Sequence, residues 1–229
     1  MDQDKGIKHM NLLLINSSDK NAFAAFYSNG ILKTVHAEEF TSNTNAPGRK
    51  ADKLIHCLDK LSRENSLEEI DAIAITIGPG SFTGIRVGLS LAKGLAFGLG
   101  KKIIPVNNFE LTLDRLTEKN RDAEYCILLE AKLPEYYYAV RKNGEISSKG
   151  SLDLENILKN LTKNTIIVGD FDDETQIKHC YFKYINVKNL KSEAESFSRL
   201  AEEKFNNNEM IDSAEAEPLY LKDFNFKKV

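Results

Sequence analysis

Several features that mark common protein classes are missing from this sequence. Its 229 residues carry 31 Lys and Arg against 34 Asp and Glu, a net charge of −3, so there is no excess positive charge with which the chain alone would bind RNA. Its three cysteines, Cys57, Cys126 and Cys180, are widely spaced and form no C-x-x-C pair. That pattern indicates neither a zinc knuckle nor a disulfide framework, and it fits a reducing cytoplasm.

Long apolar runs are missing as well. We expect no stretch of membrane-spanning length, and the polar opening Met1-Asp-Gln-Asp-Lys-Gly6 is unlike a signal peptide. The chain is therefore predicted to be cytoplasmic and to use no membrane. Its length suits one large domain or two small ones, with ample material for a core.

What the sequence does contain is a glycine turn between an apolar strand and a helix of small residues. Such a junction aims backbone N–H groups and a helix N-terminus at one spot, where an anion or another chain can dock. It is not a Walker loop, because Ile85 and Arg86 follow its last glycine, and its G-x-G-x-x-x-G spacing is not the dinucleotide fingerprint. The candidate residues of the turn are Gly78, Pro79, Gly80, Ser81, Thr83 and Gly84.

A capped turn is favoured over a phosphate site at this junction. Pro79-Gly80 makes the turn, and Ser81 or Thr83 caps the helix by accepting a backbone N–H bond. No acidic residue nearby is suited to hold a metal ion. Ser81 is not predicted to be a nucleophile, because it lacks the G-x-S-x-G frame and the four histidines carry no signal for a base.

The helix after the turn is apolar nearly all round. Gly84, Gly88, Ala92 and Ala96 recur every four residues and form a stripe without bulky side chains, which lets another backbone approach closely. Larger apolar residues run beside the stripe, so the helix should be covered on both sides. The cover is either the rest of the same domain or a subunit interface, and the pattern leaves both open.

The order of predicted elements repeats along the chain as strand-strand-strand-helix-strand-helix, which indicates two related α/β lobes. The expected lobes are residues 1–106 and 107–190, and residues 191–229 are expected to supply a last helix and a tail that packs back on the first lobe. In the first half we predict strands 11–15, 22–27, 31–36, 70–77 and 103–106, and helices 47–63 (opened by Asn45-Ala-Pro47) and 83–98. In the second half we predict strands 125–129, 136–141, 145–149 and 165–168, and helices 152–161 and 192–205, the last opened by a capping box at Ser192-Glu-Ala-Glu195.

Three segments carry a family resemblance. They are Gly78-Pro-Gly-Ser-Phe-Thr-Gly-Ile-Arg86 with the helix that follows, Glu130-Ala-Lys132 with Glu135-Tyr136, and Pro218-Leu-Tyr-Leu-Lys222. Together they resemble the TsaB (YeaZ) family, bacterial accessory proteins for making threonylcarbamoyladenosine beside the anticodon of ANN-reading tRNAs. One departure is Asn16-Ser17-Ser18, which stands where the first strand of the family usually ends in Asp-Thr-Ser. In actin-like ATPases an acid at that place orients metal and nucleotide, so Asn16 weakens any claim of ATP binding.

The resemblance implies an α/β, actin-like (ASKHA) fold in two lobes, each a mixed sheet with flanking helices. It implies no catalytic residue, metal or cofactor in this chain, because the metal-binding His-x-x-x-His and the transfer site belong to the TsaD enzyme. This sequence contains no His-x-x-x-His. The implied partners are a TsaD-type catalytic subunit and a TsaE-type ATPase, with tRNA met only indirectly.

Helices 47–63 and 83–98 are the surface on which we expect the TsaD-type partner to bind, and the same surface could form a homodimer. The alternative is an enzyme with this fold, a small-molecule kinase or a peptidase, with its own site at residues 78–86. The expected interface residues are Leu54, Ile55, Leu58, Phe82, Arg86, Leu89, Lys93 and Phe97.

Overall fold

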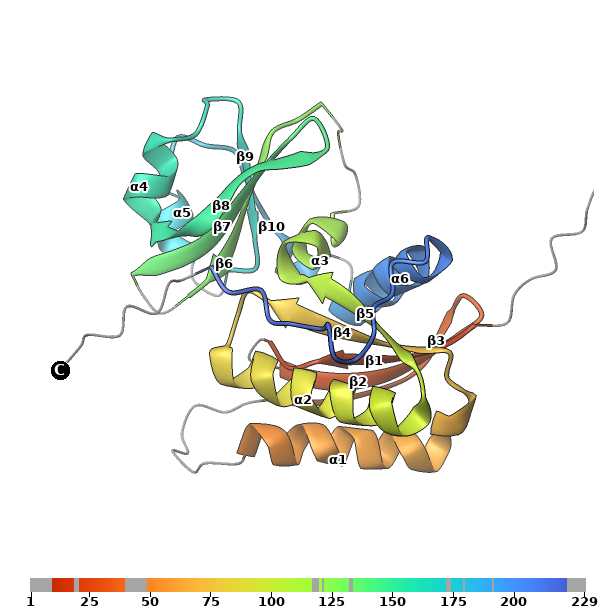
Figure 1. The fold of residues 1–229 in the computed structure, drawn as a ribbon. Coiled ribbons are helices and arrows are strands. Elements are labelled where there is room, and N and C mark those ends of the chain that lie inside the picture. Colours follow the sequence, from red (N-terminus) through yellow and green to blue (C-terminus); the bar gives the residue numbers. More distant parts are fainter. Residues whose placement is uncertain are drawn as a thin grey trace, which may run out of the picture.

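Two mixed sheets of five strands form the framework of the protein (Figure 1). The computed structural model describes residues 10–18, 21–39, 49–116, 120, 122–131, 134–171, 174–178, 180–190 and 192–221. The strand orders are β3-β2-β1-β4-β5 and β8-β7-β6-β9-β10, so the two sheets have one topology. In each sheet three strands are antiparallel and two more are added in parallel beside the first strand of the set. This confirms the predicted repeat and the predicted mixed sheets with flanking helices.

The first sheet follows the predicted order closely. Its first hairpin turns at Asn29 and Gly30, both at positive φ, as the Asn-Gly pair predicts. The proposed helix opening at Asn45-Ala-Pro47 lies outside the described residues. The strands are β1 (Asn11–Asn16), β2 (Asn21–Ser28), β3 (Ile31–Glu39), β4 (Ala72–Gly78) and β5 (Lys102–Asn107), and the helices are α1 (Arg49–Glu64), a 3-10 turn (Leu67–Glu69), α2 (Phe82–Leu99) and α3 (Asn108–Asp114).

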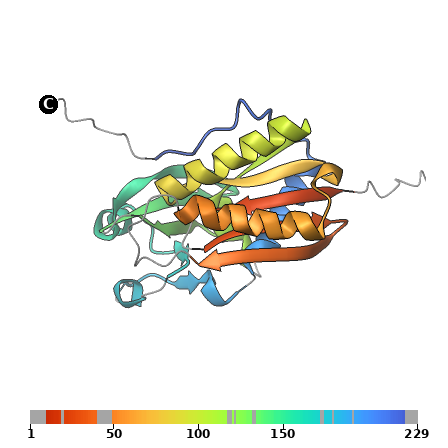
Figure 2. The same ribbon diagram turned by 90° about the horizontal axis from the view of Figure 1, so that it is seen from below.

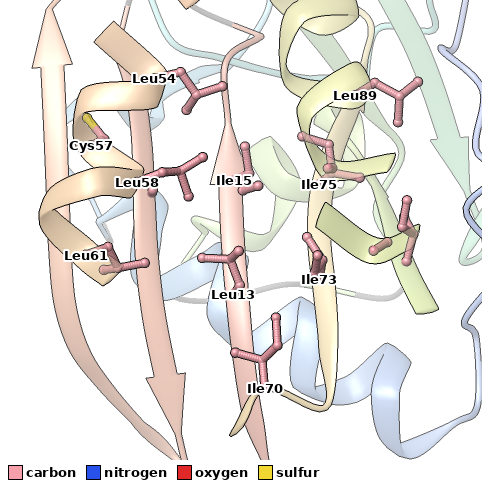
Figure 3. Packing of buried hydrophobic residues seen from close by; sticks show 14 of the residues in the cluster. Leu13, Ile15, Leu54, Cys57, Leu58, Leu61, Ile70, Ile73, Ile75 and Leu89 are labelled. Atoms are coloured by element: carbon pink, nitrogen blue, oxygen red, sulfur yellow. The ribbon is translucent and has the colours of Figure 1, made fainter. Parts of the chain in front are cut away.

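Helices α1 and α2 cover one face of this sheet (Figures 1 and 2). Figure 3 shows Leu54, Leu58 and Leu61 of α1 directed toward Leu13 and Ile15 of the central strand. Fully burying each such side chain stabilises the fold by about 1.5–3 kcal/mol. The other buried members of this cluster are Ala22, Ala24, Phe26, Cys57, Ile70, Ile73, Ile75, Leu89, Ala92, Ala96, Ile103 and Ala216.

Helix α6 (Glu193–Asn206) covers the opposite face of the same sheet, far from it in sequence (Figure 1). Phe197 and Ala201 pack there with Leu12 and Leu14 of β1. Both faces of the central strands are therefore buried, which explains why β1 and β4 are continuous apolar runs in place of alternating ones. The predicted capping box is wrong, because Ser192 occupies the N-cap position without a side-chain cap bond.

The second sheet is built from residues 125–186. The helix expected over 152–161 begins later, because Leu152 and Asp153 extend β8 and the Asp153 side chain caps the helix by accepting the N–H of Asn156. Three short elements here and α3 were not predicted. The strands are β6 (Tyr125–Glu130), β7 (Glu135–Lys142), β8 (Glu145–Asp153), β9 (Ile166–Gly169) and β10 (Tyr184–Asn186), with α4 (Leu154–Lys159), α5 (Thr175–Lys178) and a 3-10 turn (Val187–Asn189).

Helix α3 joins the two sheets. Its Phe109 and Leu113 pack with Tyr125 and Ile127 of the second sheet, although α3 directly follows β5 of the first. Arg115, just beyond α3 and nearly buried, pairs with Asp170 at 2.6 Å between Nη1 and Oδ2. The division of the chain after residues 106 and 190 stays a prediction.

Residues 209–221 run back along α2 on the side away from α1 (Figure 2). Ile211 and Ile103 exchange two backbone hydrogen bonds of 2.9 Å, and the N–H of Leu219 donates to the carbonyl oxygen of Ile77 at 2.8 Å. Ala216 is buried in the core of the first sheet. We call residues 209–221 the C-terminal strap.

Candidate partner-binding surface

The glycine turn is closed by hydrogen bonds within the chain. The N–H of Ser81 donates to the carbonyl oxygen of Ser18 at 2.7 Å, which ties the turn to the end of β1. The Ser81 hydroxyl caps α2 by accepting the N–H of Gly84 at 3.3 Å, as one of the two predicted caps, whereas Thr83 is exposed. Two backbone donors at this junction, those of Ser81 and Gly84, are thus used inside the chain.

Buried polar side chains hold the turn in place. The Asn16 side-chain oxygen accepts bonds from the N–H (3.0 Å) and hydroxyl (2.8 Å) of Ser18 and from the hydroxyl of Thr76 (2.8 Å). The Asn108 amide donates to the Ser18 hydroxyl and to the carbonyl oxygen of Pro79, both at 2.8 Å. Asn108 was not predicted, and only its place two residues after the expected strand 103–106 could have suggested it. This network joins the ends of β1, β4 and β5.

The stripe of small residues on α2 faces the protein's own first strand. Gly84, Gly88, Ala92 and Ala96 are all buried. A methyl group at Gly84 would overlap the carbonyl oxygen of Ser17, and one at Gly88 would overlap its hydroxyl oxygen. The Ser17 hydroxyl also donates to the carbonyl oxygen of Gly84 at 2.8 Å. The stripe therefore serves packing within the chain, the first of the two alternatives.

The outer sides of α1 and α2 carry large apolar residues in contact with solvent. Phe97 is 85% exposed, Ile55 is 52% exposed and Phe82 is 37% exposed. On α2, Gly94 and Gly98 are also exposed, with nothing within 4 Å of the place a side chain would take. Figure 2 shows the two helices side by side with this side toward the viewer. We call it the α1–α2 face.

Three of the expected interface residues do not lie on that face. Leu54, Leu58 and Leu89 are buried against the first sheet, where Figure 3 shows them. Their place in the core is a correction to the expected surface, because each of these residues is at most 7% exposed. Of the remaining expected residues, Ile55, Phe82 and Phe97 are the exposed apolar ones.

Arg86 and Lys93, the two expected cations, contact the C-terminal strap. The Arg86 guanidinium lies 3.7 Å from the centroid of the Phe82 ring, and its Nε donates to the Tyr220 hydroxyl at 2.9 Å. The Lys93 ammonium donates to the carbonyl oxygens of Ala214 (3.2 Å) and Ala216 (3.0 Å). Tyr220 was not predicted to take part, although it lies in the Pro-x-Tyr-Leu segment of the resemblance.

A groove of about 490 Å³ separates α2 from the strap. It is open to solvent and combines cationic, hydroxyl and apolar groups in one place. Its lining residues are Arg86, Leu89, Ser90, Lys93, Ala216, Glu217, Pro218 and Tyr220.

Comparison with known protein families assigns these helices and strands to a known family. The family model described as TsaD, tRNA N6-adenosine threonylcarbamoyltransferase, matches residues 45–168, just over half of the chain. The chain belongs to the TsaD family. The matched residues include α1, the glycine turn, α2 and most of the second sheet.

Individual relatives of the chain include proteins named TsaB and proteins named tRNA N6-adenosine threonylcarbamoyltransferase. The chain is 27% identical to the tRNA threonylcarbamoyladenosine biosynthesis protein TsaB of Haemophilus influenzae over 135 residues, 58% of this chain and 54% of that protein. The chain thus spans about half the length of this curated relative.

Solved structures agree in fold. YeaZ from Pseudomonas aeruginosa has a TM-score of 0.71 at 21% identity over 93% of this chain and all of that one. A Bacteroides thetaiotaomicron protein with actin-like ATPase fold and unknown function has a TM-score of 0.51 at 7% identity over 87% and 99% of the two chains. The expected actin-like fold is confirmed.

The remaining segments of the TsaB resemblance form no site of their own in the described residues. Glu130 is exposed at the end of β6, Tyr136 is buried in the core of the second sheet, and Lys132 lies outside the described residues. Within the described part of the chain, no group of three His, Cys, Asp or Glu side chains is placed to share a metal ion.

Helix α2 requires one correction to the expectation about membranes. By length and composition alone it is apolar enough to cross a bilayer, with a mean hydropathy of 1.2 over its 18 residues. A single helix of this kind is a weak indication, because core helices of globular proteins pass the same test. In this TsaD-family chain α2 packs against β4 and α1.

Proposed function

We propose that this protein is a non-catalytic accessory subunit of a bacterial complex that forms threonylcarbamoyladenosine beside the anticodon of tRNA. It binds a TsaD-type catalytic subunit through the α1–α2 face. A TsaE-type ATPase joins the same complex, the tRNA is met through the partners, and the complex works in the cytoplasm. The observation that carries this proposal is the exposed apolar α1–α2 face on a TsaD-family chain that is similar to TsaB.

The exposed residues have the properties of an interface centre. Aromatic anchors dominate binding energy in protein interfaces, and Phe97 and Phe82 stand exposed at opposite ends of α2. The exposed glycines on either side of Phe97, Gly94 and Gly98, leave room for a partner helix to approach closely. Two helices from each subunit can bury a standard interface of about 1,600 Å² in total.

The glycine turn supports the accessory role over a kinase or peptidase. A phosphate site at a helix N-terminus needs backbone N–H groups that point at the ligand. Here the N–H of Ser81 donates to Ser18, and the N–H of Gly84 donates to the Ser81 hydroxyl. Asn16, in the place of the metal-orienting acid, is enclosed in neutral hydrogen bonds and in one bond to Glu193.

The proposal is tested by light scattering on a sizing column with the chain alone and mixed with the TsaD-type protein of the same organism. We expect a 1:1 complex that forms at the expense of any homodimer. Ile55→Glu and Phe97→Glu should each weaken the complex by tenfold or more, on the order of 1.4 kcal/mol. Leu58→Glu is unsuitable because Leu58 is in the core, and a buried charge would unfold the chain.

Ile146→Glu is the matched control. Ile146 is 44% exposed on β8 of the second sheet, away from the α1–α2 face. The same change of character there should leave the affinity unaltered. Absence of any complex with the wild-type chain would refute the proposed function, and binding that survives both α1–α2 substitutions would refute the surface.

A further inference from the structure

Arg86 is oriented more strictly than an exposed arginine usually is. Its guanidinium stacks on the Phe82 ring at 3.7 Å and lies 5.7 Å from the centroid of the Tyr220 ring. Its Nε is occupied by the Tyr220 hydroxyl. Among the described residues, neither terminal nitrogen, Nη1 or Nη2, has a hydrogen-bond partner. Stacking and the Nε bond therefore fix the plane of the side chain and leave its terminal donors open.

Those donors border the groove between α2 and the strap. Ser90 and Lys93 follow Arg86 by one and two helical turns on the same side of α2, and both line the groove beside the strap. Glu217 is the one acidic residue among the groove-lining residues. Arg86 and Lys93 against Glu217 leave the groove with a net positive charge, which favours an anionic group.

We propose that Arg86 receives a carboxylate of the partner subunit, an Asp or Glu side chain at the edge of the helices that cover the α1–α2 face. The inference rests on the proposed function and names the chemistry of one contact within it. A planar guanidinium matches a carboxylate with two parallel hydrogen bonds, and stacking lowers the entropic cost of forming them. Phe82, on which Arg86 stacks, is itself one of the exposed residues of the face, so the ion pair would lie at the rim of an apolar contact.

Two substitutions separate this role from a purely structural one. Arg86→Gln and Tyr220→Phe both remove the hydrogen bond between Arg86 and Tyr220, but only Arg86→Gln removes the guanidinium. In titration calorimetry against the TsaD-type protein we expect Arg86→Gln to bind about thirtyfold more weakly and Tyr220→Phe to stay within about threefold of wild type. Arg86→Lys keeps the charge without the planar fork and should lose about tenfold. If Arg86 serves only to hold the strap, Arg86→Gln and Tyr220→Phe will weaken binding equally. That result would overturn the proposal.

Lys149→Gln is the matched control, because it removes one positive charge from exposed β8 in the second sheet. Its affinity should equal that of wild type. The thermal midpoint of every variant is measured first, and if Arg86→Gln fails to fold, Arg86→Lys decides the question. Failure of the wild-type chain to bind refutes the proposed function and this contact together. Normal binding by Arg86→Gln refutes this contact alone.

Binding of tRNA to the chain alone is the remaining arm of the test. A loss of tRNA affinity on Arg86→Gln, with the subunit affinity unchanged, would assign the guanidinium to a phosphate and overturn the carboxylate assignment. With the carboxylate assignment, tRNA binding by the chain alone is the same for wild type and Arg86→Gln.

Discussion

Replacing Asn16 by Asp is expected to destabilise the protein by about 3 kcal/mol at pH 7. Asn16 is fully buried, and its amide nitrogen donates to a carboxylate oxygen of Glu193 at 2.6 Å. The substitution replaces that donor by an oxygen and brings two carboxylates together. The side-chain oxygen that accepts from Ser18 and Thr76 is kept, so the loss comes from the Glu193 side alone.

Two terms give this magnitude. A hydrogen bond to a charged acceptor contributes about 1.5–3 kcal/mol. Two carboxylate charges about 4 Å apart repel by about 4 kcal/mol at an effective dielectric constant of 20, so the pair avoids part of this cost by keeping one proton. A net loss of about 3 kcal/mol would lower the thermal midpoint of a chain of this size by about 6–12 °C.

The pH dependence has a definite sign. In the folded Asn16→Asp variant the introduced carboxyl group and Glu193 share a proton, because one pKa of the pair is raised above the ordinary value for Asp of about 3.9. Between that value and the raised pKa the folded state binds more protons than the unfolded chain, so stability falls as the pH rises through this window. The deficit of the variant relative to wild type should therefore shrink as the pH is lowered from 7 toward 5.

Urea unfolding of four proteins tests this reasoning: wild type, Asn16→Asp, Glu193→Gln and the double variant. In the double variant the amide introduced by Glu193→Gln can donate to the new carboxylate, so we expect most of the lost stability to return. If Asn16→Asp costs the same in the wild-type background and in the Glu193→Gln background, the two side chains are not coupled and the argument from their hydrogen bond fails.

Two further predictions concern the glycines and the cysteines. Gly84→Ala should destabilise the protein by about 1–3 kcal/mol, because the methyl group meets the carbonyl oxygen of Ser17 just after β1. Gly94→Ala places its methyl group in open space and should stabilise the helix by about 0.5–1 kcal/mol. Equal effects of the two substitutions in thermal unfolding would contradict the packing of α2. Burial raises the pKa of the Cys126 thiol to about 12, and Cys57 is also buried. A thiol reagent at pH 8 should therefore label Cys180 alone in the folded chain. In denaturant the same reagent should label all three cysteines. Fast labelling of Cys126 in the folded protein would show that the second sheet opens.

The regular elements could be predicted because local pattern determines them. Both Asn-Gly pairs, at 29–30 and 143–144, form hairpin turns at positive φ. Helix α3 was missed because its residues, among them Asn108, Thr112 and Asp114, are buried whether they are polar or apolar, so it shows no amphipathic period. An element buried between two sheets has no solvent side to mark it.

The candidate surface was only partly predictable for a different reason. Apolar spacing identified α1 as amphipathic, but Leu54 and Ile55 are neighbours in sequence and lie about 100° apart around the helix. One is in the core and the other is exposed. Periodicity alone does not say which edge of an apolar stripe faces the sheet. The contact between Arg86 and Tyr220 joins residues 134 apart, and no local pattern reports it.

The position of α6 and the C-terminal strap has a consequence for how the protein is made. Both elements cover the first sheet, yet residues 193–221 leave the ribosome after the whole second sheet, residues 125–186, has emerged. Until then the face of β1 that Phe197 covers and the edge of β5 that Ile211 pairs with stand open. The lobe that is translated first is therefore completed last, and during synthesis its unpaired edge and apolar face are the parts of the nascent chain that most need protection from aggregation.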